Sequence, residues 1–283
     1  MPGSPFSADI RRQIEEDAAG VEEELIDSFR RFVGVVRRLR KDCPWDREQT
    51  HESVKHLMIE EVYEAVEAID EGDILALRNE LGDLLLHVLF HGDIAETDGT
   101  FTSQEVIERE LAKLVHRHPH VYGDEQVGSA GDVLTNWEQI KRTEGGGAPK
   151  PVLSGVPKQL PALLRAHRIQ EKVAGVGFDF PDAESAWGKV AEEMAEFRSA
   201  MASGSQAEKK HEMGDVLFAL VNYGRLSGLV PEDALRGTND RFTRRFGHIE
   251  ARLAEQGRQP ADATLDEMDS LWEEAKTHEK GER

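Results

Sequence analysis

The chain has 283 residues, of which 39% are hydrophobic and 32% are charged, and its formal net charge is −20 at pH 7. This composition allows a packed core, and its abundance of Glu, Ala, Leu and Arg favours helices. Such an acidic surface repels nucleic acid backbones and anionic membranes, so we expect no nucleic acid and no membrane as partners.

Cys43 is the single cysteine, which excludes an intrachain disulfide and fits a reducing compartment. The longest apolar stretch, residues 84–90, is too short to span a bilayer, and residues 1–20 lack the pattern of a secretion signal. We therefore expect a cytoplasmic protein.

The first half of the chain predicts three main helices after a short tail. Residues 1–20 are expected to be a flexible tail, and apolar residues at helical spacing predict a helix over residues 21–41. A second helix is expected over about 53–70, with Ser53 as its N-cap. After a Gly-containing turn, a third helix is expected over about 74–97.

The second half repeats this pattern at a constant, ungapped offset, which relates Glu60 to Glu192. The matching residues of the first copy include Glu61, Glu64, Glu80, Gly82 and Asp83. In the same order, those of the second copy are Glu193, Glu196, Glu212, Gly214 and Asp215. Apolar positions between them stay apolar, which duplication explains better than chance. The sequence therefore predicts an all-α fold of two tandem helical-bundle modules, residues 21–142 and 162–283, joined by a Gly/Pro-rich linker over 143–161.

The repeated acids have the spacing of a metal site. Glu61 and Glu64 lie three residues apart on the second helix, and Glu80 and Asp83 lie three apart on the third. A short turn makes these helices antiparallel neighbours, so four carboxylates can converge. Each close pair of carboxylates repels by about 1 kcal/mol in water and about 4 kcal/mol at an effective dielectric near 20. All-oxygen ligands favour Mg²⁺, Mn²⁺ or Ca²⁺ over zinc. If only one copy were present, these acids would be better interpreted as ordinary solvated helix surface. The second copy, with the same acids in the same register, favours a metal site.

The motif Glu-Glu-x-x-Glu followed by Glu-x-x-Asp resembles the signature of the MazG-like all-α nucleoside triphosphate pyrophosphohydrolases. Longer segments are similar to MazG segments and occur in the same order. They are CPWDREQTHES at 43–53, ELGDLLLHV at 80–88, RHPHVYGD at 117–124, GVPKQLPALLRA at 155–166 and VGFDF at 176–180. The resemblance covers nearly the whole chain from about Val21.

This resemblance implies hydrolysis of the α–β bond of nucleoside triphosphates, with release of a monophosphate and pyrophosphate. It implies Mg²⁺ as cofactor, with Mn²⁺ as a substitute, bound in the first copy by Glu61, Glu64, Glu80 and Asp83, and in the second by Glu193, Glu196, Glu212 and Asp215. Glu60 and Glu192 become candidates for orienting or deprotonating the attacking water, and Glu193 is expected to be catalytic as well as metal-binding.

Basic and aromatic residues are expected to hold the triphosphate and stack on the base. By resemblance these are Arg241, Arg244, Arg245, Trp272 and Lys276 in the second copy, and Lys113, Arg117, Trp137 and Lys141 in the first. For any one of them, the surface of an amphipathic helix is an equally good interpretation. Lys189 lies one turn before Glu193, where the first copy has Leu57, so it either reaches a phosphate oxygen or forms a surface ion pair. We expect the second copy to be the dominant site.

The leading hypothesis is a pyrophosphohydrolase of broad base specificity that cleans nucleotide pools. One alternative is a narrower pyrophosphatase, for dUTP or phosphoribosyl-ATP, and another is a non-catalytic, acidic helical adaptor. The apolar faces of each short helical pair need more cover than one copy supplies, so a homodimer is expected.

Overall fold

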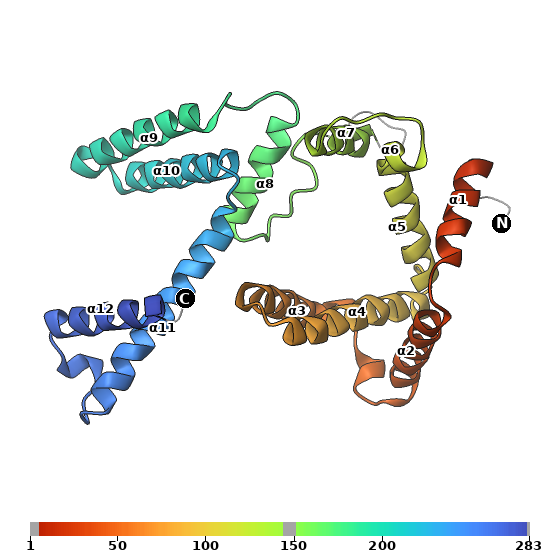
Figure 1. Ribbon diagram of the computed structural model, residues 1–283, viewed down its shortest axis with the longest axis horizontal. Coiled ribbons are helices and arrows are strands. Elements are labelled where there is room, and N and C mark those ends of the chain that lie inside the picture. The colour runs from red at the N-terminus through yellow and green to blue at the C-terminus, as the bar shows by residue number, and fades with distance from the viewer. Residues whose placement is uncertain (1–5, 144–150, 282–283) are drawn as a thin grey trace. The chain divides into compact units, whose positions relative to one another are not determined.

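The computed structural model describes residues 6–143 and 151–281, and every regular element in these ranges is helical (Figure 1). This confirms the all-α fold expected from composition and periodicity. The chain divides into two compact units, Met1–Glu144 and Gly145–Arg283. Residues 144–150 of the expected linker lie outside the described residues. None of the described helices has both the length and the apolar character that crossing a membrane requires.

The first unit contains one 3-10 turn, η1 (Asp46–Glu48), and the helices α1 (Ala8–Ala19), α2 (Glu23–Asp42), α3 (His51–Glu71), α4 (Ile74–Thr97), α5 (Ser103–Arg117), α6 (Pro119–Tyr122) and α7 (Ala130–Thr143). The second unit contains η2 (Pro260–Asp262) and the helices α8 (Ala162–Ala174), α9 (Ala183–Ser203), α10 (Gln206–Leu226), α11 (Pro231–Ala254) and α12 (Leu265–Gly281).

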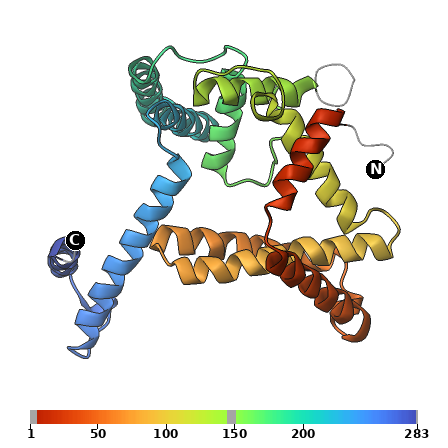
Figure 2. The ribbon, with the colours of Figure 1, turned by 45° about the vertical axis from the view of Figure 1, so that its right-hand side comes forward.

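Each unit is organised around one antiparallel helical pair, α3 with α4 and α9 with α10 (Figures 1 and 2). The first pair turns at Gly72, whose φ of 71° is left-handed, and Asp73 then caps α4 by accepting the N–H groups of Leu75 and Ala76. The second pair turns differently. A Cβ on Gly204 would lie 2.7 Å from the Ala200 carbonyl oxygen, so close backbone approach requires glycine there.

Helix α3, which the sequence predicted over about 53–70, begins two residues earlier, at His51. Thr50, not Ser53, is the N-cap of α3, and Ser53 completes a capping box from the third helical position. The Thr50 hydroxyl accepts the Ser53 N–H at 3.2 Å, while the Ser53 hydroxyl accepts the Thr50 N–H at 2.9 Å. In α9, Asp182 caps the N–H of Ser185 at 2.8 Å, and this hydrogen bond lowers the pKa of Asp182.

The N-terminal segment expected to be a flexible tail contains a helix, α1. Its N-cap Ser7 accepts the N–H of Ile10 at 3.3 Å, and the Arg, Gln and Glu residues that follow are good helix formers. None of the residues of α1 is buried. Local propensity and a cap therefore account for this helix, which the sequence analysis overlooked.

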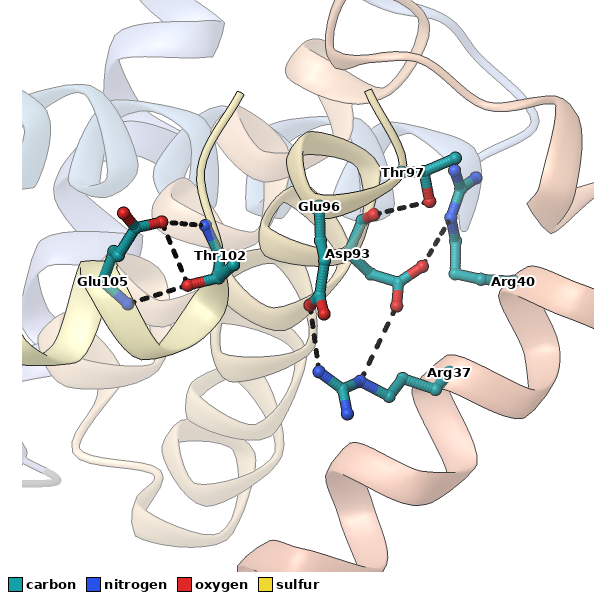
Figure 3. Close-up of polar contacts among 7 residues, drawn as sticks. All are labelled: Arg37, Arg40, Asp93, Glu96, Thr97, Thr102 and Glu105. Atoms are coloured by element: carbon teal, nitrogen blue, oxygen red, sulfur yellow. Dashed lines mark hydrogen bonds and ion pairs between the residues drawn. The ribbon is translucent and has the colours of Figure 1, made fainter. Parts of the chain in front are cut away.

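The core of the first unit lies where α2 packs on α3 and α4, and its buried residues are Val36, Val54, Leu89, Phe90 and Ile94. Arginines of α2 reach acids of α4 at the edge of this core (Figure 3). The Arg40 side chain is only 8% exposed, and its Nε lies 3.4 Å from an Asp93 oxygen. Its guanidinium also donates to the carbonyl oxygens of Asp46 and Gln49 and lies over the Phe90 ring, 5.0 Å from its centroid. Arg40 therefore fastens α2, the η1 turn and α4 together.

We expect Arg40→Met to destabilise the first unit by about 2 kcal/mol, because it removes the nearer of two arginines from the half-buried Asp93 carboxylate and a donor from the carbonyls of Asp46 and Gln49. Arg38→Met is the control on the same helix, since the Arg38 side chain is 78% exposed and pairs with Asp42 of its own helix. It should change stability by less than about 0.5 kcal/mol. Urea denaturation of the two variants measures the difference, and equal shifts would show that the Arg40 contacts do not stabilise the fold.

Candidate active site

Carboxylates converge on the helical pair of each unit. One oxygen from each of Glu193, Glu196 and Glu212 lies within 4.8 Å of the others. Likewise, the first unit brings together one oxygen each from Glu61, Glu64 and Glu80. The structure thus assembles three of the four acids that the sequence nominated in each unit, with two acids from one helix and one from its neighbour.

The fourth acid of each set lies near at least one of the other three. Asp215 shares a cluster with Glu212 and His211, again within 4.8 Å. In the first unit, burial and then the negative charge of Asp83 raise the pKa of Glu61. Burial raises the pKa of Glu80, and the negative charges of Glu64 and then Asp83 raise it further. These carboxylates therefore repel one another, and a bound cation would relieve that repulsion.

Lys189 lies between two acids of α9. Its Nζ is 2.8 Å from a Glu192 oxygen and 2.7 Å from a Glu193 oxygen, and these contacts raise the pKa of Lys189. Glu193 is buried, whereas Glu192 is largely exposed. The ion pair considered in the sequence analysis is therefore formed. Glu60, which corresponds to Glu192, is exposed on α3.

A cavity of about 500 Å³ opens beside the carboxylates of the second unit, between α8, α9, α10 and the loop that joins α8 to α9. Lys189, Glu193 and Asp215 line it together with a mostly apolar set that includes Ile169, Phe178, Phe180, Phe218 and Ala219. The carboxylates and Lys189 thus belong to the wall of a pocket large enough for a small organic molecule. Sequence reasoning missed the apolar wall, although the VGFDF segment at 176–180 marked its position.

The first unit has different side chains at the positions that correspond to this cavity. Leu57 stands where α9 has Lys189, and His87 stands where α10 has Ala219. Leu57 packs against the core, and His87 is 8% exposed with its Nε2 3.9 Å from a Glu61 oxygen. Burial lowers the pKa of His87. Core side chains therefore occupy positions that, in the second unit, line the cavity.

Unlike Lys189, the other basic and aromatic residues nominated in the second unit lie on the α11–α12 hairpin and do not line the 500 Å³ cavity. They are Arg241, Arg244, Arg245, Trp272 and Lys276. Arg245 donates to Glu279 at 2.7 and 2.9 Å and lies over the Trp272 ring, 5.4 Å from its centroid. The other nominated cations also have local partners. Arg244 pairs with Glu279 at 3.7 Å, Lys276 pairs with Glu273 at 2.6 Å, and Arg241 donates to Thr238 at 2.8 Å.

The corresponding residues of the first unit lie on α5 and α7. Lys113 pairs with Glu110 of its own helix and lines a second cavity, of about 490 Å³, next to α1. Trp137 lies beside His118, with ring centroids 6.1 Å apart. Arg117 is on α5 and Lys141 is on α7. A role in substrate binding for these residues stays a prediction in both units.

Comparison with known proteins agrees with the resemblance. Residues 49–122 match the model of the MazG nucleotide pyrophosphohydrolase domain. The chain is 40% identical over 250 residues to the nucleoside triphosphate pyrophosphohydrolase/pyrophosphatase MazG of Thermotoga maritima, with 88% of this chain and 95% of that protein covered. It is 38% identical over 255 residues to the nucleoside triphosphate pyrophosphohydrolase of Escherichia coli K12, with 88% and 97% covered.

The uncharacterized protein YabN of Bacillus subtilis is 48% identical over 265 residues. That alignment covers 92% of this chain and 54% of YabN, so the chain spans about half the length of this relative. The Thermotoga and Escherichia proteins, in contrast, are matched over almost their whole length. The chain therefore belongs to the MazG family of nucleotide pyrophosphohydrolases.

Proposed function

We propose that this protein hydrolyses nucleoside triphosphates between the α- and β-phosphates, releasing a nucleoside monophosphate and pyrophosphate with the help of Mg²⁺. One observation carries the proposal beyond family membership. Glu193 and Asp215 belong both to the carboxylate clusters and to the wall of the 500 Å³ cavity. A nucleoside in that cavity would therefore have its phosphates beside the metal ligands.

The donor set of the second unit suits a hard divalent cation. Glu193, Glu196, Glu212 and Asp215 offer only carboxylate oxygens, and Mg²⁺ prefers oxygen ligands and readily shares its shell with phosphates. The Glu212 Oε2 atom is buried and has no hydrogen-bond partner among the described residues. Mg²⁺ bound there, or Mn²⁺ in its place, would offset phosphate charge and lower the pKa of a bound water.

The chain's own residues would orient the substrate and manage the proton. The water oxygen bonds to the α-phosphorus, the bond to the bridging oxygen breaks, and pyrophosphate leaves with that oxygen. Glu192 is exposed beside Lys189 and is the candidate acceptor for the proton of the water. The Lys189 ammonium would exchange part of its contact with Glu192 and Glu193 for a phosphate oxygen.

The apolar wall of the cavity supports broad base specificity and a role in cleaning nucleotide pools, because such walls discriminate weakly between planar rings. The cytoplasm, where those pools lie, is the location we propose.

With Mg²⁺, we expect pyrophosphate and a nucleoside monophosphate as the first products from each common nucleoside triphosphate. The physical reason is that the carboxylates lie beside the cavity, so the phosphate nearest the nucleoside is the one attacked. Anion-exchange chromatography of early time points measures this. Nucleoside diphosphate and orthophosphate as primary products would contradict the proposed bond cleavage, and a chelator control should abolish either activity.

The two sites are proposed to be unequal, with the second unit dominant. Asp215→Asn should lower kcat by at least roughly 100-fold, since it weakens a metal ligand beside the cavity. Asp83→Asn makes the matched change in the first unit, where Leu57 and His87 replace the cavity residues, and should leave most of the activity. Steady-state kinetics decides between these outcomes. Equal losses would indicate two equivalent sites, and the reverse order would place the chemistry in the first unit.

We also propose a homodimer, because the helical pairs leave large apolar side chains exposed. On α3 and α4 these include Ile59 (55% exposed), Tyr63 (50%), Leu81 (54%) and Val88 (51%), and α9 and α10 expose Trp187, Met213, Leu217 and Leu220. Large apolar side chains exposed together on a helical pair favour association with another protein surface.

Light scattering at micromolar concentration should therefore give at least twice the chain mass of 31.7 kDa. Replacing both Leu81 and Val88 by Glu should shift the protein toward a monomer, because the charges would have to be buried. A monomeric mass for the unaltered protein would contradict the homodimer.

A further inference from the structure

The amide of Asn222 is held in one orientation at the wall of the 500 Å³ cavity. Asn222 lies on α10 and lines the cavity. Arg225, one turn further on, donates to Asn222 Oδ1 from Nε at 3.1 Å and from Nη2 at 2.8 Å. A guanidinium can only donate hydrogen bonds, so it must face the carbonyl oxygen of the amide and not its NH₂ group. The Asn222 NH₂ group is therefore turned away from Arg225.

Arg225 is itself held in place by the loop that closes the cavity. Its side chain is 12% exposed, and its Nη2 contacts an oxygen of Asp179, which lies between α8 and α9. The same Asp179 oxygen accepts the N–H of Phe180 at 2.9 Å. Asp179, Phe180 and Asn222 all line the cavity. The loop and the amide are thus joined through one nearly buried guanidinium.

Asn222 and the acid Asp215 line the cavity from different positions along α10. Asn222 follows Asp215 by two helical turns on the same face of α10, which places it about 10 Å further along the helix axis. Between them, Phe218 and Ala219 supply apolar wall. If the phosphates lie at Asp215, the base of a nucleotide lies near Asn222. A polar donor in such apolar surroundings gains most from a ligand acceptor, since leaving it unpaired there costs free energy.

The first unit has no amide at the corresponding position. Phe90 stands there, 6% exposed, with the Arg40 guanidinium over its ring. An arginine therefore contacts the residue at this helical position in both units, and in the second unit that residue carries a hydrogen-bond donor and lines a cavity.

We propose that Asn222 is a specificity-determining residue whose NH₂ group donates to an acceptor atom on the nucleotide base, and that Arg225 and Asp179 are positioning residues for it. This rests on the proposed function, because it assumes that the cavity takes the nucleoside. Every common base carries ring nitrogens or carbonyl oxygens that accept such a bond. One fixed donor thus favours a nucleotide over a phosphorylated sugar without selecting strongly among bases.

The test compares binding of a nucleotide with binding of the same phosphate and sugar without a base. Calorimetry with Mg²⁺ measures the affinities of adenosine monophosphate and of ribose 5-phosphate for the full-length protein. Asn222→Leu, which removes the donor, should weaken adenosine monophosphate binding by about tenfold. Ribose 5-phosphate binding should change less than twofold.

Asn222→Asp is the second variant, because it keeps an oxygen for Arg225 to hold and replaces the NH₂ donor by a negatively charged acceptor oxygen. It should show the same selective loss, which separates a lost hydrogen bond from damage to the Arg225 contacts. Equal losses for both ligands, or no loss for adenosine monophosphate, would overturn the proposal. Pyrophosphate release by the unaltered protein is measured in parallel. Its absence would overturn the proposed function, while the two binding affinities would still decide the role of Asn222.

Discussion

Repulsion between carboxylates that two antiparallel helices force together is the constraint on which the site depends. Three-residue spacing puts two acids on one face of each helix, and tight turns at Gly72 and Gly204 bring the partner helices alongside. The raised pKa values of Glu61 and Glu80, to which the charges of neighbouring acids contribute, reflect this repulsion. The packing of α2 on α4, and of α8 on α10, keeps these helices in place despite that repulsion. A cation bound in each unit, as proposed above, would balance this repulsion.

Local patterns predicted the helices and the convergence of the acids. Helical periodicity and the Gly72 turn are sufficient to place Glu61 and Glu64 opposite Glu80, because these contacts involve adjacent helices. The errors were also local. The capping box at Thr50 starts α3 at His51, ahead of the expected N-cap Ser53. Ser7 caps a helix in the segment that was expected to be a flexible tail. The duplication that the repeated acids suggest stays a prediction from sequence.

The cavity could not be predicted in this way, because its walls come from segments that are distant in sequence. Phe180 in the loop before α9 and Ile169 on α8 meet Ala219 on α10 only once the second unit is folded. The two units also differ in side-chain volume at two positions that correspond in the repeat, His87 with Ala219 and Phe90 with Asn222. His87 and Phe90 contribute to the packed interior of the first unit, whereas Ala219 and Asn222 leave room and a polar group in the second. The two similar helical pairs thus differ in the side chains that surround their carboxylates.

Mn²⁺ binding followed by electron paramagnetic resonance tests most directly whether the α9–α10 carboxylates hold the catalytic cation. The free Mn²⁺ signal is titrated against the unaltered protein and against a Glu196→Gln, Glu212→Gln double variant, with circular dichroism to establish that both are folded. The double variant should lose one class of Mn²⁺-binding sites and keep the sites of the first unit. Identical Mn²⁺ binding by the two folded proteins would contradict it.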